Sequence, residues 1–265
     1  MVAQLPTVPI LAHQDLDIQW EPLPDDYVLP DDPVENLQQP LLAAALTDAL
    51  GAAGWIRPEM LIASNFGLVA TVAGKTVVKA PDWLYVPQVQ PVAESVIRRS
   101  YTPHAEGAAV AIVMEFLSET ETGEYSVRPV YPYGKLFFYQ RILQVPTYVL
   151  FDPASVTLQV FRLEGETYQA TEPDAQGRFW LPEMQLFLGI WQGTRLGTTT
   201  HWLRWWDADG NLLLWSSEQA EEARKQAEQA QQQAEQAQQQ AEQERDRADQ
   251  LAAKLRDLGV DPEQL

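Results

Sequence analysis

The stretch AAVAIVMEFL, residues 108–117, is an almost continuous apolar run with the length of one β-strand. Such runs are typical of strands that are covered on both faces, so we expect this strand at the centre of a sheet. The segment KLFFYQRIL, residues 135–143, carries an apolar face of helical size, and PTYVLFD, residues 146–152, indicates a second buried strand. The pattern therefore predicts two central strands joined by a helix.

The segments on either side of this unit extend the same fold. Residues 36–50 have helical apolar spacing, and residues 61–72 and 76–86 are predicted as two strands around a glycine turn. Residues 156–163 and 167–170 alternate like a hairpin at the margin of the sheet. This order predicts an α/β domain with a central mixed sheet flanked by helices. A doubly wound nucleotide fold is excluded, because the sequence has no G-x-G-x-x-G or phosphate-binding lysine loop.

The two ends of the chain differ in composition from this body. Residues 1–32 are rich in proline and aspartate and are predicted to be an extended arm. Residues 217–258 contain no proline or glycine, and small or apolar residues recur there at spacings of three and four, which predicts a long helix in a coiled coil. A dimer is the expected state, with a solvated single helix as the alternative. The folded domain is then residues 33–216, and residues 259–265 form a short tail.

Composition limits the chemistry that this protein can perform. The absence of cysteine excludes a disulfide scaffold, a zinc ribbon, an iron–sulfur site and a thiol nucleophile. No run reaches the roughly 18–20 apolar residues of a bilayer span, and the first residues lack the features of a signal peptide, so we expect a cytoplasmic protein without membrane contact. The formal net charge of −19 repels nucleic acid, and that partner therefore requires a locally positive cleft or a remote acidic surface.

Three charged residues stand against apolar backgrounds. Asp82 begins a predicted strand segment, Glu115 lies inside the central strand, and Lys135 opens the following helix. A carboxylate buried in a strand is unfavourable by several kcal/mol unless a cation or hydrogen bonds compensate it. Two carboxylates that share Mg²⁺ or Mn²⁺ both stay ionised, and a nearby lysine stabilises phosphate charge or orients water. Cleavage of phosphodiester bonds uses this combination of two acids, a metal ion and a lysine.

Each of these residues also has a purely structural interpretation. Glu115 could form an ion pair at a strand end with Arg98, Arg99 or Lys135. Asp82 follows a proline, which suits a turn or the start of a strand. Lys135 suits the solvated first turn of a helix. Only the combination of the three residues favours the catalytic interpretation over the structural one.

The order of short motifs around these residues is specific. Pro81-Asp82 is followed by Glu115 and Ser118, then by Lys135 and Tyr139, and finally by Val145-Pro146-Thr147-Tyr148 and Asp152-Pro153. This pattern, which covers roughly residues 33–195, resembles the Uma family of restriction-endonuclease-like proteins, whose members are similar to PD-(D/E)xK nucleases. The Ala/Glu/Gln/Arg-rich end of the chain also resembles the tails of a cyanobacterial branch of that family.

The resemblance implies a restriction-endonuclease-like core and a metal-dependent endonuclease that hydrolyses DNA phosphodiester bonds. It implies that Asp82 and Glu115 bind Mg²⁺ or Mn²⁺ and that Glu35 is an additional catalytic acid. The lysine expected two residues after Glu115 is replaced by Leu117, so the basic role falls to Lys135, which follows a longer insert than usual. The alternative function is a non-catalytic interaction module that keeps the nuclease fold and oligomerises through its C-terminal helix.

The remaining candidates have simpler explanations. Loop histidines more often have no catalytic or ligand role, which applies to His104 and still more to His13 and His201. Aromatic side chains can stack on bases, but a hairpin turn at residues 207–211 favours the packing of a terminal strand pair against the domain. The side chains expected to pack in this way are Trp202, Trp205 and Trp206.

Overall fold

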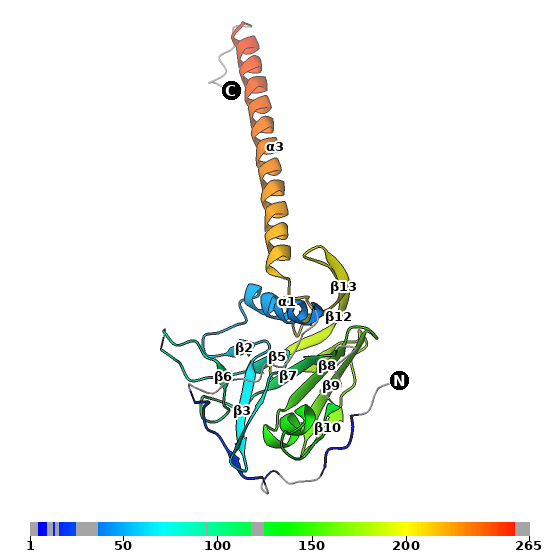
Figure 1. Ribbon diagram of the computed structural model, residues 1–265. Coiled ribbons are helices and arrows are strands. Elements are labelled where there is room, and N and C mark those ends of the chain that lie inside the picture. Colours follow the sequence, from blue (N-terminus) through cyan, green and yellow to red (C-terminus); the bar gives the residue numbers. More distant parts are fainter. Residues whose placement is uncertain are drawn as a thin grey trace. The chain divides into compact units, whose positions relative to one another are not determined.

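The computed structural model describes residues 5–9, 13, 16–24, 37–93, 95–117 and 125–257 of the chain. The chain divides into two compact units, Met1–Trp215 and Ser216–Leu265. Every strand of the described residues lies in the first unit, and the second contains the long helix α3 (Figure 1).

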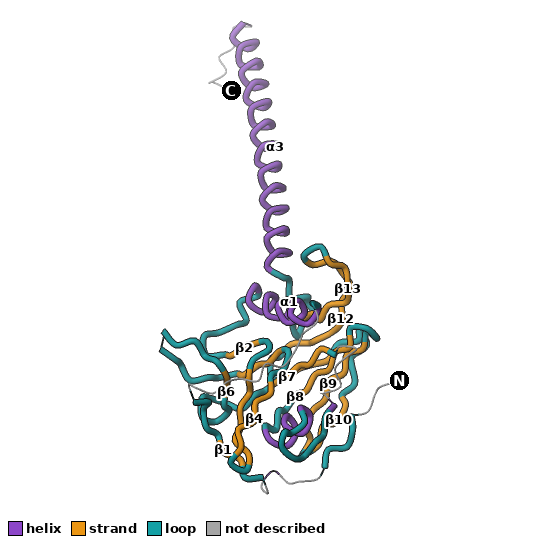
Figure 2. Tube along the Cα trace, in the orientation of Figure 1, coloured by secondary structure: helices purple, strands orange, loops and turns teal. Residues whose placement is uncertain are grey.

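A mixed six-stranded sheet forms the centre of the first unit (Figure 2). Its order is β10-β9-β8-β7-β5-β2, and its members are β2 (Leu61–Ala63), β5 (Trp83–Val86), β7 (Ile112–Phe116), β8 (Thr147–Asp152), β9 (Thr157–Glu164) and β10 (Thr167–Ala170). Strand β7 is entirely buried and pairs in parallel with β8 and antiparallel with β5. The central strand and the β9–β10 hairpin at the sheet edge are therefore confirmed.

Helical segments cover both faces of this sheet. On one face lies α1 (Gln38–Ala52), and on the other lie α2 (Lys135–Phe137) and η3 (Phe138–Ile142), which connect β7 to β8. Successive side chains of a strand point to opposite faces, so Met114 packs in the core under α1 while Val113 packs with η3. The predicted helix over 135–143 is confirmed, although its second part is a π-helix.

The predicted strands over 61–72 and 76–86 are each divided in two, so those boundaries were wrong. Their outer parts are β2 and β5 of the central sheet, whereas β3 (Gly67–Val72) and β4 (Lys75–Lys79) form a hairpin in a separate four-stranded sheet with β1 (Ile18–Gln19) and β6 (Ser100–Tyr101). Asn65 has a positive φ of 47°, which ends an extended run, and Pro81 has no amide proton for a sheet ladder.

A third sheet extends the core on the α1 side. It consists of β11 (Phe179–Leu181), β12 (Leu186–Arg195) and β13 (Thr198–Trp206), all antiparallel. Trp202 and Trp205 are almost completely buried in the core, and Nε1 of Trp205 donates a 3.1 Å hydrogen bond to the carbonyl of Leu46 in α1. The prediction that these rings pack against the domain is confirmed.

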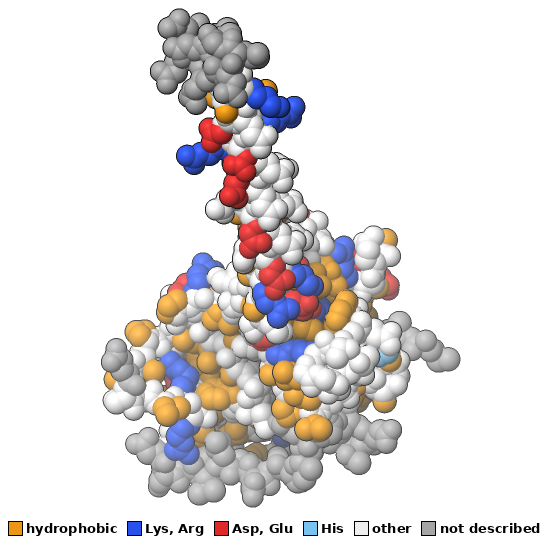
Figure 3. All heavy atoms as spheres, turned by 90° about the horizontal axis from the view of Figure 1, so that it is seen from above, with side chains coloured by type: hydrophobic (Ala, Val, Ile, Leu, Met, Phe, Trp, Pro, Cys, Tyr) orange, Lys and Arg blue, Asp and Glu red, His pale blue; other side chains and the backbone are white. Residues whose placement is uncertain are grey.

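The second unit is the helix α3 (Ser216–Asp257), as the composition predicts. Its side chains are nearly all exposed, and charged ones follow its length (Figure 3). Some form ion pairs one turn apart, such as Lys225 with Glu221 at 2.7 Å. The coiled coil stays a prediction. None of the helices in the described ranges combines the length and the apolar character that a bilayer crossing requires.

Candidate functional site

Glu115 is buried in the central strand and has two partners from the connecting helix. Its side chain is 1% exposed. Its Oε2 lies 3.2 Å from Nζ of Lys135, and its Oε1 accepts a 2.8 Å hydrogen bond from the Tyr139 hydroxyl. Residues four apart share one face of a helix, which explains why both side chains reach the same carboxylate. The cation and the hydroxyl supply the compensation that a buried carboxylate requires.

Asp82 lies beside Glu115 at the start of β5. The antiparallel register pairs Trp83 with Met114, so continuation of the ladder places Asp82 opposite Glu115. The alternation of β5 assigns Asp82 to the face of Leu84, which is also the face of α2 and η3. Its Oδ2 accepts a hydrogen bond of 2.5 Å from the backbone amide of Phe116. The structure therefore brings Asp82, Glu115 and Lys135 together.

Tyr139 also belongs to this cluster, although the sequence indicated it only as part of the family motif. Burial raises the pKa of its hydroxyl well above the usual value, and the negative charge of Glu115 raises it further, with a smaller effect from Asp82. The phenol consequently keeps its proton and remains a donor to Glu115. The spacing of four residues from Lys135 was the signal that could have identified it.

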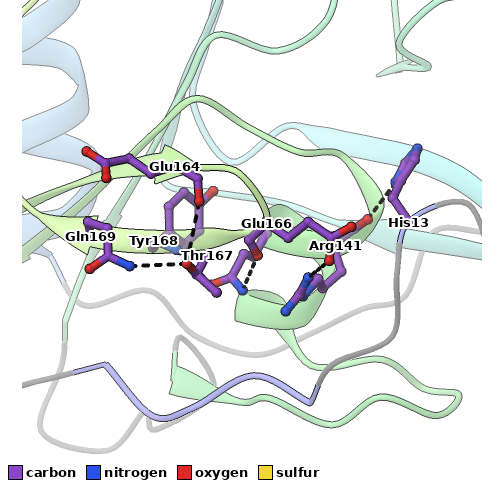
Figure 4. A network of polar contacts seen from close by, with 8 residues as sticks. His13, Arg141, Glu164, Glu166, Thr167, Tyr168 and Gln169 are labelled. Carbon is purple, nitrogen blue, oxygen red and sulfur yellow. Dashed lines mark hydrogen bonds and ion pairs between the residues drawn. The ribbon is translucent and has the colours of Figure 1, made fainter.

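The helix that carries Lys135 and Tyr139 is anchored to the β9–β10 turn (Figure 4). Arg141 is buried, and its Nη1 lies 2.6 Å from Oε2 of Glu166. Nε2 of Gln140 donates a 3.0 Å hydrogen bond to the carbonyl of Glu166. Nδ1 of His13 lies 2.8 Å from the Arg141 carbonyl, which gives this histidine a structural contact. These contacts fix the part of the chain that presents Tyr139 to the sheet.

The other predicted residues have different surroundings. Leu117 is partly buried against the core shared with η3, so an apolar side chain occupies the position where the family motif has lysine. Arg98 pairs with Glu106 at 2.5 Å. The ring of His104 contacts Trp20 edge to face. Glu35 lies outside the described residues.

The chemistry of the donor atoms fits a hard divalent cation. Carboxylate oxygens such as those of Asp82 and Glu115 are the ligands that Mg²⁺ and Mn²⁺ prefer, and each oxygen can accept more than one bond. Within the described ranges, no group of three or more His, Cys, Asp or Glu side chains could hold a metal ion. A cation at this pair would therefore depend on water or substrate oxygens as well, which is common for Mg²⁺.

A comparison with protein-family models identifies the family of this chain. The model of the family Uma2, described as "Putative restriction endonuclease", matches residues 18–197. The match extends from β1 through β12 and includes Asp82, Glu115 and Lys135. No curated protein matches the chain. The resemblance stated from the motifs is thus confirmed, together with the restriction-endonuclease-like fold class.

Proposed function

We propose that this chain, which belongs to the Uma2 family, is a metal-dependent endonuclease that hydrolyses DNA phosphodiester bonds at the site of Asp82, Glu115 and Lys135. The observation that supports it most directly is the 3.2 Å contact between the ammonium of Lys135 and the buried carboxylate of Glu115, next to Asp82. Two acids on one face of the sheet and an amine from the helix that covers this face are groups that hydrolysis of a phosphodiester by water can use.

Each residue has a role that follows from its position. Asp82 and Glu115 would hold Mg²⁺ or Mn²⁺, which when bound lowers the pKa of water and offsets charge on the leaving oxygen. The side chain of Lys135 is 25% exposed, so part of it is open to solvent, from which a phosphate would approach. Tyr139 keeps the Glu115 carboxylate in one orientation through its hydrogen bond. Glu35, the family's additional acid, would assist them.

The direct test is cleavage of plasmid DNA in the presence of MgCl₂ or MnCl₂. We expect cleavage by the full chain, its loss with EDTA, and a decrease of about 10²-fold or more for Asp82→Ala and for Glu115→Ala. Circular dichroism establishes that each variant is folded. Glu164→Gln, which changes an exposed carboxylate of the β9–β10 hairpin, is the matched control and should cleave normally. Absence of cleavage with both metals on plasmid and linear duplex would overturn the proposal and favour the interaction module.

We also propose that α3 associates with a second copy of itself to form a dimer, with the two helices either parallel or antiparallel. The side chain of Leu251 is 54% exposed on this helix, and Leu255 follows one turn later. Light scattering of the full chain should give a dimer mass, and Leu251→Lys with Leu255→Lys should give a monomer. Gln243→Lys with Gln250→Lys adds the same charge away from the apolar positions and should stay dimeric. An equal mass for all three proteins would contradict this association.

A further inference from the structure

Most cations of the first unit are paired with nearby carboxylates. Arg162 with Glu183 and Arg195 with Asp48 are examples, at 2.6 and 3.0 Å. Lys75 and Arg128 are different: both are exposed, and neither forms an ion pair with a carboxylate of the described residues. No carboxylate of the described residues therefore neutralises these two cations, in a chain whose formal net charge is −19.

These two cations meet at one aromatic side chain. Nζ of Lys75, from β4, lies 4.9 Å from the centre of the Tyr131 ring. Nη2 of Arg128 donates a 3.3 Å hydrogen bond to the carbonyl of Tyr131. A ring or a carbonyl holds a cation in place without neutralising its charge. Lys75, Arg128 and Tyr131, here called the Tyr131 cluster, thus bring two positive charges to one exposed place on the described surface, and Tyr131 is itself 47% exposed.

Two members of the Tyr131 cluster, Arg128 and Tyr131, belong to the turn that leads directly into α2. The amide of Gly134 donates a 3.0 Å hydrogen bond to the carbonyl of Arg128, which closes the turn one residue before Lys135. The ring of Tyr131 packs edge to face on Tyr133, and Tyr133 stacks on Phe137 of α2 with ring centres 5.7 Å apart. The helix that presents Lys135 to Glu115 is therefore connected by packed rings to the Tyr131 cluster.

We propose that the Tyr131 cluster binds the phosphate backbone of duplex DNA next to the scissile phosphate. This inference rests on the proposed function and identifies where an acidic protein contacts its substrate. The overall charge repels DNA, so binding requires a surface where cations are exposed and not paired with acids. Among the described residues, Lys75 and Arg128 meet this condition. Arg128 lies in the turn that continues into Lys135, and Lys75 reaches the same turn from β4.

The test measures binding without catalysis. Fluorescence anisotropy with a labelled duplex in EDTA gives the association constant over a series of salt concentrations. Each phosphate contact contributes about 0.9 to the slope of log K against log salt concentration, so Lys75→Gln with Arg128→Gln should reduce that slope by about 2, and each single variant by about 1. Lys75→Arg with Arg128→Lys should keep the original slope, because both charges remain.

A matched control removes two exposed cations elsewhere. Arg57 and Lys225, with side chains 65% and 61% exposed, are paired with carboxylates, and Arg57→Gln with Lys225→Gln changes the net charge by the same amount. This control should keep the slope of the original protein. Equal slopes for both double variants, no salt-dependent binding by the full chain, or tighter binding of RNA than of duplex DNA would each overturn the proposal.

The same proteins separate this inference from the proposed hydrolysis. If the slope falls as expected but no metal supports cleavage, the Tyr131 cluster is a DNA contact and the hydrolytic function is wrong. If DNA is cleaved but the slope does not change, the hydrolytic function holds and the Tyr131 cluster is not the contact.

Discussion

Replacement of Tyr139 by phenylalanine should lower the free energy of unfolding by about 1.5–3 kcal/mol, which is typical of a lost hydrogen bond to a charged group. The Tyr139 hydroxyl donates at 2.8 Å to Glu115, and its ring is fully buried, so water cannot replace it without a rearrangement. Phenylalanine keeps the ring and leaves no large cavity. Urea unfolding followed by fluorescence should show a lower midpoint with an unchanged m value.

Tyr168→Phe is the matched control for this change. The hydroxyl of Tyr168 is also buried, but it donates at 2.9 Å to the carbonyl of Val145, a neutral acceptor. Its loss should therefore lower the free energy of unfolding by only about 0.5–1.5 kcal/mol. In a Glu115→Gln background, Tyr139→Phe should have an effect of about that same size, and the difference measures the coupling between the two residues.

A larger loss for Tyr139→Phe than for Tyr168→Phe is expected only if Glu115 is a buried negative charge that the Tyr139 hydroxyl stabilises. If Tyr139→Phe destabilises the original protein no more than Tyr168→Phe does, then the hydroxyl does not support a buried negative charge at Glu115. The geometry on which the proposed metal site rests would then be wrong, whatever the cleavage assay shows.

Three further predictions concern the stability of the fold. Glu166→Gln should lower the free energy of unfolding by about 1–3 kcal/mol, since the buried guanidinium of Arg141 loses its carboxylate partner. Glu164→Gln, which changes an exposed side chain, should change it by less than about 0.5 kcal/mol. Urea unfolding measures both. Gly134→Ala should lower the free energy of unfolding by about 1–3 kcal/mol, because the added Cβ would overlap the backbone carbonyl of Ser126. Gly51→Ala in α1 has room for the Cβ and should raise the free energy of unfolding by roughly 0.5–1 kcal/mol. A higher free energy of unfolding for Gly134→Ala would contradict the prediction. Burial, reinforced by the negative charge of Glu106, raises the pKa of Tyr101 from 10.0 to about 12. The contribution of Tyr101 to stability is therefore complete below pH 10 and is lost as the pH rises to 12. Absorbance titration of Tyr101→Phe should lack one phenol that ionises late, and a curve identical to that of the original protein would disprove this assignment.

Part of the candidate site could be predicted because it depends on local pattern. The apolar run around Glu115 made this acid an anomaly, and the helix that begins at Lys135 follows from its own periodicity. The contact between them joins residues 20 positions apart and depends on how the helix crosses the sheet. The contact of Arg141 with Glu166, from a hairpin on the far side of β8, was for the same reason absent from the sequence reasoning.

The sequence by itself determined the order of strands and helices around residues 108–152, because hydrophobic periodicity and chain breakers act over a few neighbouring residues. It also determined which charged side chains would need compensation. Only the tertiary structure decided that β3 and β4 leave the central sheet, that Tyr139 shares Glu115 with Lys135, and that Lys75 and Arg128 meet at Tyr131. These outcomes depend on the register and packing of segments distant in the chain, where the free energy of a contact depends on both partners and is not encoded in either segment alone.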